Sequence, residues 1–334
     1  GACGAAMAAA VPHFLAKLAA DGVIQGVISL GGGGGTAIGT AAMRALAVGF
    51  PKVMVSTLAS GNTAPYVGTT DIVMFPSIVD VAGLNRLSRL LFARAAGAVC
   101  GMVEAEVGEE AERPLVVASM FGNTTTCVND AKTLLEAAGY EVLVFHATGS
   151  GGKAMEDLIS SGMVSGVLDV TTTEWADELV GGTLGAGPTR LDAAAKAGIP
   201  AVIAPGCLDM VNFGAKETVP GSFAGRNFYI HNPQVTLMRT NAEECAQLGK
   251  IIAEKANCYS APVTLMIPEK AISIIAADGQ PFHDPAADEA LFTALKHHAK
   301  VPVISLPETI NSKSFAHAAA LQLLENINNQ HHKL

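Results

Sequence analysis

Short apolar runs rich in β-branched residues alternate with segments of helical periodicity along most of this chain. The first run covers residues 23–30 and ends at five consecutive glycines, residues 31–35. An Ala-rich segment with helical propensity follows Thr36. The pattern predicts a strand, a glycine loop and a helix that begins after Thr36, and this unit organises the N-terminal part of the chain.

The same periodicities predict the other elements of the N-terminal part. Apolar residues recur at helical spacing before Gly22, so the chain begins in or just before a helix. Further runs predict strands over residues 52–57 and 71–75 and a long helix over residues 80–103. A doubly wound domain normally begins with a strand, and the chain lacks a starting methionine. We therefore interpret the sequence as a fragment, a processed chain or a truncated form.

An acidic segment, residues 104–113, separates two α/β patterns, so we predict a first domain over residues 1–105 and a second over residues 106–334. The second domain shows a regular alternation of strands and helices. Its strands are expected over residues 114–120, 140–147, 164–171, 199–205, 262–267 and 301–306, and its first two helices over residues 129–139 and 153–162. The predicted fold class is α/β, with two Rossmann-like subdomains that are doubly wound and mainly parallel.

Right-handed crossovers place the loops that follow the strands of the second domain along one edge of its sheet. These loops cover residues 121–126, 146–152, 171–174 and 205–209. Parallel sheets bind their ligands at the carboxyl ends of the strands. This edge is therefore a second place to look for binding chemistry, besides the glycine loop.

The glycine loop is a candidate phosphate site. Glycines allow a sharp turn that brings backbone N–H groups close to an oxyanion, and the following helix adds the positive end of its dipole. The loop lacks the Gly-Lys-Ser/Thr ending of a P-loop, and no acidic residue closes a recognisable second strand as in a dinucleotide site. Nucleotide binding and a plain tight turn in a buried sheet are both compatible with it.

Loops expected at the carboxyl ends of the next strands add small hydroxyl and amide groups. These groups could hydrogen-bond a phosphate or a ribose, although ordinary turn chemistry also explains them. The predicted nucleotide site, for ATP with or without Mg²⁺, consists of Gly31, Gly32, Gly33, Gly34, Gly35, Thr36, Ser60, Gly61, Asn62, Thr69 and Thr70.

A second anion site is predicted in the second domain, in a cleft between the domains. Two glycine-containing loops open helices there and offer N–H and hydroxyl donors, and a lysine adds a positive charge. The predicted residues are Gly122, Asn123, Thr124, Thr125, Gly149, Ser150, Gly151, Gly152 and Lys153. The alternative is that these loops merely cap their helices and that the lysine is solvated.

Candidate catalytic residues are His146, Lys153 and His231. His146 could act as a general acid or base, although a histidine at a strand end is more often structural. Glu174 and Asp177 could hold a metal, but no third ligand stands at suitable spacing, so we interpret them as helix caps and predict no metal site.

The helix over residues 80–103 carries many leucines together with Arg86, Arg89 and Arg94. We interpret it as a connector or a subunit interface, and we expect a homodimer. An arginine that reaches a phosphate is the alternative role.

Charge and cysteine usage exclude some classes of function. Twenty-one basic and thirty acidic side chains give a formal charge of −9 without any basic run, so direct binding to nucleic acid is not expected. The six cysteines are scattered and form no Cys-x-x-Cys pair, which indicates reduced, mostly buried thiols of a cytoplasmic protein. No membrane segment or signal peptide is expected.

Several long motifs resemble a known family. They are SLGGGGGTAIGTAAMRAL, PKVMVSTLASG with PYVGTTD, VFHATGSGGKAMEDLI, DVTTTEWADELVGG, LDMVNFG, HNPQVTLMRT and GQPFHDPAAD. In this order they resemble bacterial and fungal proteins related to the amino-terminal ATP-binding domain of the tomato mosaic virus resistance protein. The resemblance covers nearly the whole chain and implies two Rossmann-like subdomains, a dimer and ATP binding.

The resemblance also sets limits on what can be expected. Family members usually carry an additional amino-terminal segment with a Gly-Thr-x-Asp-Thr-Lys-like turn, which this sequence does not contain, and the carboxyl-terminal barrel of the plant protein is absent too. The plant relative inhibits a viral replication protein, whereas most bacterial members have no assigned reaction. We therefore expect an ATP-binding protein, with two alternatives: an enzyme for a small phosphorylated or carboxylated metabolite, or an interaction protein that the nucleotide regulates.

Overall fold

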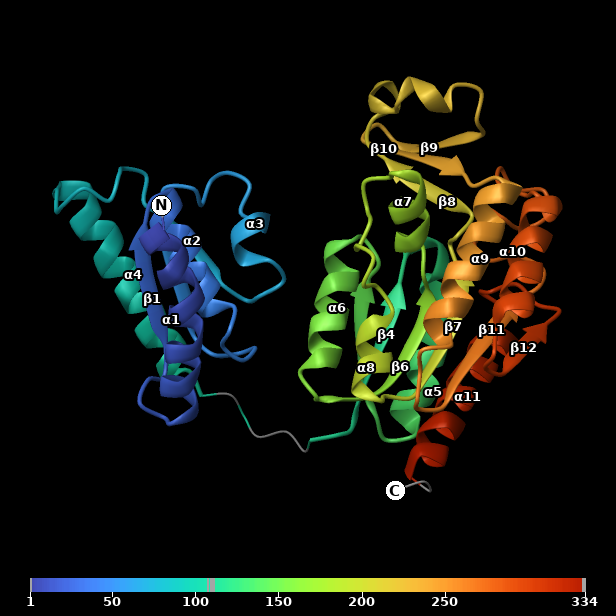
Figure 1. Cartoon of the computed structure of the whole chain (residues 1–334), viewed down its shortest axis with the longest axis horizontal. Coiled ribbons are helices and arrows are strands. Elements are labelled where there is room, and N and C mark those ends of the chain that lie inside the picture. Colours follow the sequence, from blue (N-terminus) through green and yellow to red (C-terminus); the bar gives the residue numbers. More distant parts are fainter. Residues whose placement is uncertain (1, 107, 109–111, 332–334) are drawn as a thin grey trace. The chain divides into compact units, whose positions relative to one another are not determined.

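The computed structural model describes residues 2–106, 108 and 112–331, and the chain divides into two compact units, Gly1–Ala111 (unit 1) and Glu112–Leu334 (unit 2) (Figure 1). Residues 107 and 109–111 of the predicted acidic boundary lie outside the described residues. Both units are parallel sheets flanked by helices, so the predicted α/β class with Rossmann-like layers is confirmed.

Unit 1 has a three-stranded parallel sheet in the order β1-β2-β3. Val53 and Val55 of the central strand pack against Ala95 on one face of this sheet, and Met54 faces Gly39 on the other. Helices therefore cover both faces. The elements are α1 (Ala2–Ala20), β1 (Val27–Gly31), α2 (Gly33–Met43), β2 (Lys52–Ser56), α3 (Ala64–Val67), β3 (Val73–Pro76) and α4 (Arg86–Glu104).

Two predicted helix starts in unit 1 are wrong. Helix α2 begins at Gly33 and not after Thr36, because the Thr36 N–H already donates to the Gly32 carbonyl at 2.8 Å, the first bond of the helix. Helix α4 begins at Arg86 and not at residue 80. Asn85 sets this start, since its side chain accepts from the N–H of Ser88 at 2.9 Å while the Ser88 hydroxyl accepts from the Asn85 N–H at 2.8 Å.

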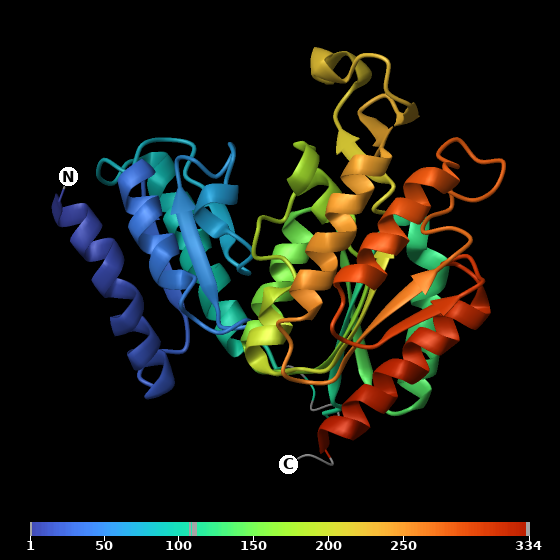
Figure 2. The same cartoon turned by 45° about the vertical axis from the view of Figure 1, so that its right-hand side comes forward.

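Unit 2 is built on a parallel sheet with helices packed along it (Figure 2). The sheet has six strands in the order β12-β11-β7-β6-β4-β5. The elements are β4 (Leu115–Met120), α5 (Thr125–Ala137), β5 (Glu141–His146), α6 (Ser150–Ser160), β6 (Val164–Thr171), α7 (Glu174–Val180), α8 (Asp192–Ala197), β7 (Ala201–Gly206), β8 (Met210–Phe213), β9 (Phe228–Asn232), β10 (Val235–Arg239), α9 (Ala242–Ala256), β11 (Val263–Pro268), α10 (Pro285–His298), β12 (Val303–Leu306) and α11 (Lys313–His331), with short 3-10 turns at Gly122–Thr124, Lys216–Thr218 and Gly221–Phe223.

Successive strand residues of unit 2 point to opposite faces of the sheet. Val116 and Ala118 pack with α5 and α11, while Val117 packs with the core formed by α6 to α10. The strands predicted for unit 2 are all present. Helices α5 and α6 begin a few residues earlier than predicted, at Thr125 and Ser150, because their first turns consist of the Thr, Ser and Gly residues that usually indicate loops.

The sequence did not predict the small antiparallel sheet β8-β10-β9, which follows β7. Its strands are only four or five residues long, and they carry polar residues such as Asn212, His231 and Asn232 within apolar stretches. The free thiols predicted from the cysteine spacing are confirmed for the described side chains: Cys127, Cys207 and Cys245 are buried, and Cys100 and Cys258 are exposed.

Candidate functional site

The glycine turn of unit 1 lies at the carboxyl end of β1, where α2 begins. Gly32 is the N-cap of α2, and this glycine brings no capping side chain to the helix start. Gly33 and Gly34 are exposed, and a Cβ atom added to either would meet no other atom of the described chain within 4 Å. The first N–H groups of an α-helix lack intrahelical partners. The N–H groups of Gly33 and Gly34 therefore have no partner within α2 and lie at the positive end of the helix dipole.

The base of this turn is closed by contacts within unit 1. Thr36 is fully buried, and its hydroxyl lies 2.6 Å from the Ser56 hydroxyl. A Cβ on Gly31 would come within 2.8 Å of the Gly35 Cα, so Gly31 allows the helix to start directly against the strand. Thr36 thus joins α2 to β2, and its side chain does not point out of the turn.

The loop after β2 lies beside the glycine turn, as predicted for Ser60, Gly61 and Asn62, which are exposed there. The sequence analysis missed Thr57, the first residue of this loop. Its hydroxyl lies 3.7 Å from the position that a Gly32 Cβ would occupy. Its place at the carboxyl end of the strand predicted over residues 52–57 was the signal that could have identified it.

The predicted placement of Thr69 and Thr70 is wrong. Both residues precede β3, whose Val73 pairs with Val53 near the start of β2, so they lie at the amino edge of the sheet. The next residue, Asp71, bonds Lys52 at the first position of β2 at 2.6 Å, which fixes this edge. The glycine turn is at the opposite edge, because Gly31 pairs with Ser56 at the end of β2.

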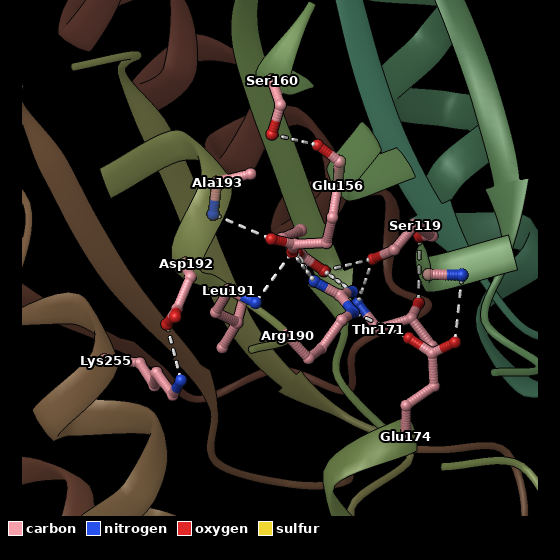
Figure 3. A network of polar contacts seen from close by, with 12 residues as sticks. Ser119, Glu156, Ser160, Thr171, Glu174, Arg190, Leu191, Asp192, Ala193 and Lys255 are labelled. Carbon is pink, nitrogen blue, oxygen red and sulfur yellow. Dashed lines mark hydrogen bonds and ion pairs between the residues drawn. The ribbon is translucent and has the colours of Figure 1, made fainter. Parts of the chain in front are cut away.

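The second glycine turn, at the start of α6 in unit 2, is occupied by a side chain of the same chain (Figure 3). The N–H groups of Gly149 and Gly152 donate to Glu174 Oε1 at 2.6 and 3.1 Å. Arg190 Nε donates to the other carboxylate oxygen of Glu174 at 2.7 Å. Glu174 therefore supplies an internal anion at the turn where the sequence predicts an external one.

Arg190 is the centre of a buried ionic network. Its two terminal nitrogens donate to both oxygens of Asp169 at 2.5 and 2.7 Å, and one of them also reaches Glu156 at 3.2 Å (Figure 3). Arg190 is 1% exposed and Asp169 is 1% exposed. One guanidinium group thus forms ion pairs with three carboxylates, from α6, β6 and α7, and these ion pairs connect the three elements.

Glu156 also caps a neighbouring helix. Its two carboxylate oxygens accept from the N–H groups of Leu191 and Ala193, at 2.7 and 2.8 Å, at the start of α8. Burial raises the pKa of Glu156 in spite of the opposing charge of Arg190. Leu191 has a left-handed backbone with φ of 75°, which this cap and the Arg190 network stabilise.

The interpretation of Glu174 and Asp177 as helix caps is confirmed for Glu174, although the helix that it caps is α6, and is wrong for Asp177. Glu174 binds the start of α6, as described above. Asp177 accepts from Leu184 N–H at 3.2 Å and from both the backbone and side-chain nitrogens of Asn212, at 2.9 and 2.7 Å. Burial raises the pKa of Asp177 to about 6 despite these hydrogen bonds. Both acids thus connect different segments of unit 2.

The other predicted residues of the second anion site lie at the carboxyl edge of the sheet, as expected, but on different faces. Helix α5, which follows Gly122, Asn123 and Thr124, packs with α11, whereas α6 packs with the opposite core. The Thr124 hydroxyl lies 2.8 Å from that of Thr171, which bridges the loops after β4 and β6. The order of the strands reverses between these two, where such sheets usually bind ligands.

The structure does not bring the three candidate catalytic residues into one constellation. His146 is exposed at the end of β5, and its ring centroid lies 5.3 Å from that of Phe121. Lys153 is exposed on the first turn of α6. His231 is exposed on β9, in the separate antiparallel sheet.

The sequence analysis did not select Arg190, Asp169 or Glu156. An aspartate in the middle of the apolar run of β6 was the available signal, because a strand buried on both faces holds a charge only if a partner neutralises it. In the parts of the chain that the structure describes, no three or more His, Cys, Asp and Glu side chains form a group suited to a metal ion. Likewise, no described helix has the length and apolar character of a membrane span.

The fold and these turns define an α/β protein of two parallel-sheet units, each with a glycine-rich turn at the start of a helix. The chain belongs to the Uncharacterised protein family (UPF0261): residues 1–108 match its N-terminal domain and residues 113–327 match its C-terminal domain. The family resemblance of the sequence motifs is thereby confirmed.

Relatives from bacteria and a plant are similar over most of the chain. A UPF0261 protein of Clostridium tetani is 55% identical over 92% of this chain and 77% of its own length. UPF0261 protein RA0729 of Rhizobium meliloti is 49% identical over 95% of this chain and 80% of its own length. The ToMV resistance protein Tm-1(GCR237) of Solanum lycopersicum is 44% identical over 96% of this chain, which covers 44% of the tomato protein.

Proposed function

We propose that this protein binds a nucleotide, ATP with or without Mg²⁺, and that the phosphates lie against the first turn of α2 in unit 1. The observation that carries the proposal is the open glycine turn formed by Gly32, Gly33 and Gly34. Its N-cap residue, Gly32, has no side chain that could accept hydrogen bonds from the first N–H groups of α2. In unit 2, by contrast, the N–H groups of Gly149 and Gly152 at the start of α6 already donate to Glu174. The family resemblance of the sequence implies ATP, which agrees with a phosphate at this turn.

The contacts suggest a division of roles within the proposed site. The Thr36 N–H and hydroxyl are engaged inside unit 1, so the donors for phosphate are the N–H groups of Gly33, Gly34 and Gly35. Thr57 and the exposed loop with Ser60 and Asn62 stand next to the turn and can hydrogen-bond the rest of the ligand. Thr69 and Thr70 are at the other edge of the sheet and are not included in the proposed site.

Replacing both Gly33 and Gly34 by valine is expected to raise the dissociation constant for ATP at least about 100-fold, a loss of roughly 2.7 kcal/mol. The new side chains would occupy space around the turn that is open in the protein, and they would hinder the close approach of a phosphate to its N–H groups. The fold should persist, because valine has a higher helix propensity than glycine. Isothermal titration of ATP with and without Mg²⁺ measures the affinity, and thermal unfolding checks the fold.

The matched control is Gly97→Val with Gly101→Val in α4. These glycines are also exposed in a helix, and a Cβ on either would meet no atom of the described residues within 4 Å. The control protein should bind ATP as the wild type does. Wild-type ATP affinity in the Gly33→Val, Gly34→Val protein would disprove the proposed phosphate site.

Two alternative functions stay as hypotheses. One is an enzyme for a small anionic metabolite that uses Lys153, His146 or His231, and the other is an interaction protein that the nucleotide regulates. A thermal-shift panel of nucleotides and metabolites separates them, because a ligand at 100 times its dissociation constant stabilises the protein by about 2.7 kcal/mol. A shift with a metabolite supports the enzyme, whereas a shift with nucleotides and with no metabolite is the result expected for the interaction protein.

We also propose that the protein is a cytoplasmic homodimer that uses the region of α4 as its interface. Leu84 and Leu90 are 68% and 46% exposed there, so a partner that covers α4 would bury their apolar side chains. Leu90→Glu should shift the mass measured by light scattering from dimer to monomer. Leu321→Glu, at a leucine of α11 that is 57% exposed, serves as the control. A monomeric wild type at micromolar concentration would refute this interface.

A further inference from the structure

The start of α6 has the geometry of an anion site, and the anion is the side chain of Glu174. Two backbone N–H groups, from Gly149 and Gly152, and the Nε of Arg190 surround this carboxylate at 2.6 to 3.1 Å. A guanidinium together with N–H groups at a helix N-terminus is a strong donor set for a carboxylate. Each of the two oxygens of Glu174 has a partner in this set.

The turn is shaped around its occupant. Glu174 and Arg190 are each 1% exposed, so water does not reach the ion pair. A Cβ on Gly152 would overlap the Glu174 carboxylate, and therefore only a glycine at this position leaves room for it. An external anion cannot share this space while α7 is docked on α6.

We propose that Gly149, Gly152 and Arg190 form a carboxylate-binding site whose resident ligand is Glu174, and that external phosphate does not enter it in the folded protein. The site suits a monoanion, because Arg190 also neutralises Asp169 at 2.5 and 2.7 Å and reaches Glu156. A phosphate dianion in the place of Glu174 would bring two negative charges to a buried cluster in which Asp169 and Glu156 already share one cation. The proposal concerns unit 2 alone and does not depend on nucleotide binding in unit 1.

Small monocarboxylates are the ligands that such a site should accept once Glu174 is shortened. Glu174→Ala should leave a cavity lined by the same three donors, which formate or acetate can occupy. Loss of one partner of a buried ion pair should lower the melting temperature by roughly 10 °C. Formate that replaces chloride at constant ionic strength should restore at least half of this loss, in a saturable way.

The controls for this rescue are the wild type and Glu269→Ala. Glu269 is an exposed partner of Lys296, so its removal creates no buried site. Formate should not change the melting temperature of either protein, and phosphate should rescue Glu174→Ala less than formate does. The proposal is overturned if formate and chloride act alike on Glu174→Ala, or if formate raises the wild type equally.

A double-mutant cycle tests the same site without an added ligand. Gly152→Ala should be strongly destabilising alone, and Glu174→Ala should remove most of that cost, because the overlap of the new Cβ is with the carboxylate. Gly151→Ala is the matched control, since its Cβ would overlap the His146 carbonyl, a clash that Glu174→Ala leaves in place. Additive changes in melting temperature for Gly152→Ala with Glu174→Ala would contradict the proposal.

If Glu174→Ala does not fold, Glu174→Gln provides the test. This variant keeps the shape of the side chain and removes its charge, so formate should not stabilise it. In protein labelled with ¹⁵N-glycine, the amide proton resonances of Gly149 and Gly152 should move upfield in Glu174→Gln, because their acceptor loses its charge. Unchanged resonances would show that the carboxylate is not the ligand of this turn.

Discussion

Replacing Arg190 by methionine is expected to lower the free energy of unfolding of unit 2 by about 4 kcal/mol or more at neutral pH. The change would leave Asp169, Glu174 and Glu156 without their shared cation in a site that is closed to water. Breaking a buried ion pair by removing one partner typically costs about 3–5 kcal/mol, and here three carboxylates lose theirs. Arg190→Lys should also destabilise, because an ammonium group cannot make the forked contacts with Asp169 and the contact with Glu174 together.

Urea unfolding followed by the fluorescence of Trp175 measures this effect. Trp175 is the single tryptophan of the chain, is 6% exposed and directly follows Glu174 in α7. Lys196→Met is the control, since Lys196 is a 71% exposed partner of Asp192 and such a surface pair contributes only about 0–1 kcal/mol. Equal losses for Arg190→Met and Lys196→Met would mean that the network does not stabilise unit 2.

The strands of this protein were easier to predict than the starts of its helices. The strands of unit 2 are short apolar runs bounded by turn residues, and this local pattern is enough to find them. The starts of α2, α5 and α6 were predicted too late, because Gly33, Thr125 and Ser150 have weak helix propensities and helix formation there depends on packing.

The candidate sites illustrate a further limit of the sequence. Both glycine turns were found, since the glycine-rich residues 31–35 and 149–152 each separate a strand pattern from a helical pattern. The sequence could not show that the side chain of Glu174, 25 residues beyond Gly149, fills the second turn. It also could not show that no side chain caps the first turn, at Gly32. Thr70 was assigned to the wrong edge because α3 and its loops return the chain to the start of β3, a path that hydrophobic patterning does not reveal.

Replacing Asp177 by asparagine is expected to make unit 2 less sensitive to pH. Burial raises the pKa of Asp177 to about 6, above its ordinary value of 3.8. Between these two values the folded protein binds more protons at this site than the unfolded chain, so stability falls as pH rises. Above pH 6 the wild type has lost up to about 3 kcal/mol relative to pH 3.8, at 1.36 kcal/mol per unit of pKa shift.

Asparagine fits this position without the titratable charge. The Asn212 amide donates to Asp177 at 2.7 Å, while the Oδ1 atom of Asn212 is buried and has no hydrogen-bond partner among the described residues. A flip of the Asn212 amide would therefore offer an acceptor to the NH₂ group of the introduced side chain. We expect Asp177→Asn to be near neutral or destabilising at pH 4 and progressively more stable relative to the wild type up to pH 8.

Urea unfolding at a series of pH values, again followed by Trp175 fluorescence, tests this expectation. Asp278→Asn is the matched control because Asp278 is fully exposed, so its difference from the wild type should stay nearly constant over the same range. The difference between Asp177→Asn and the wild type should change by about 2.4 kcal/mol in favour of the variant between pH 4 and pH 8. A difference that is flat with pH, or that favours the wild type as pH rises, would show that Asp177 ionises in the folded protein as readily as in the unfolded chain.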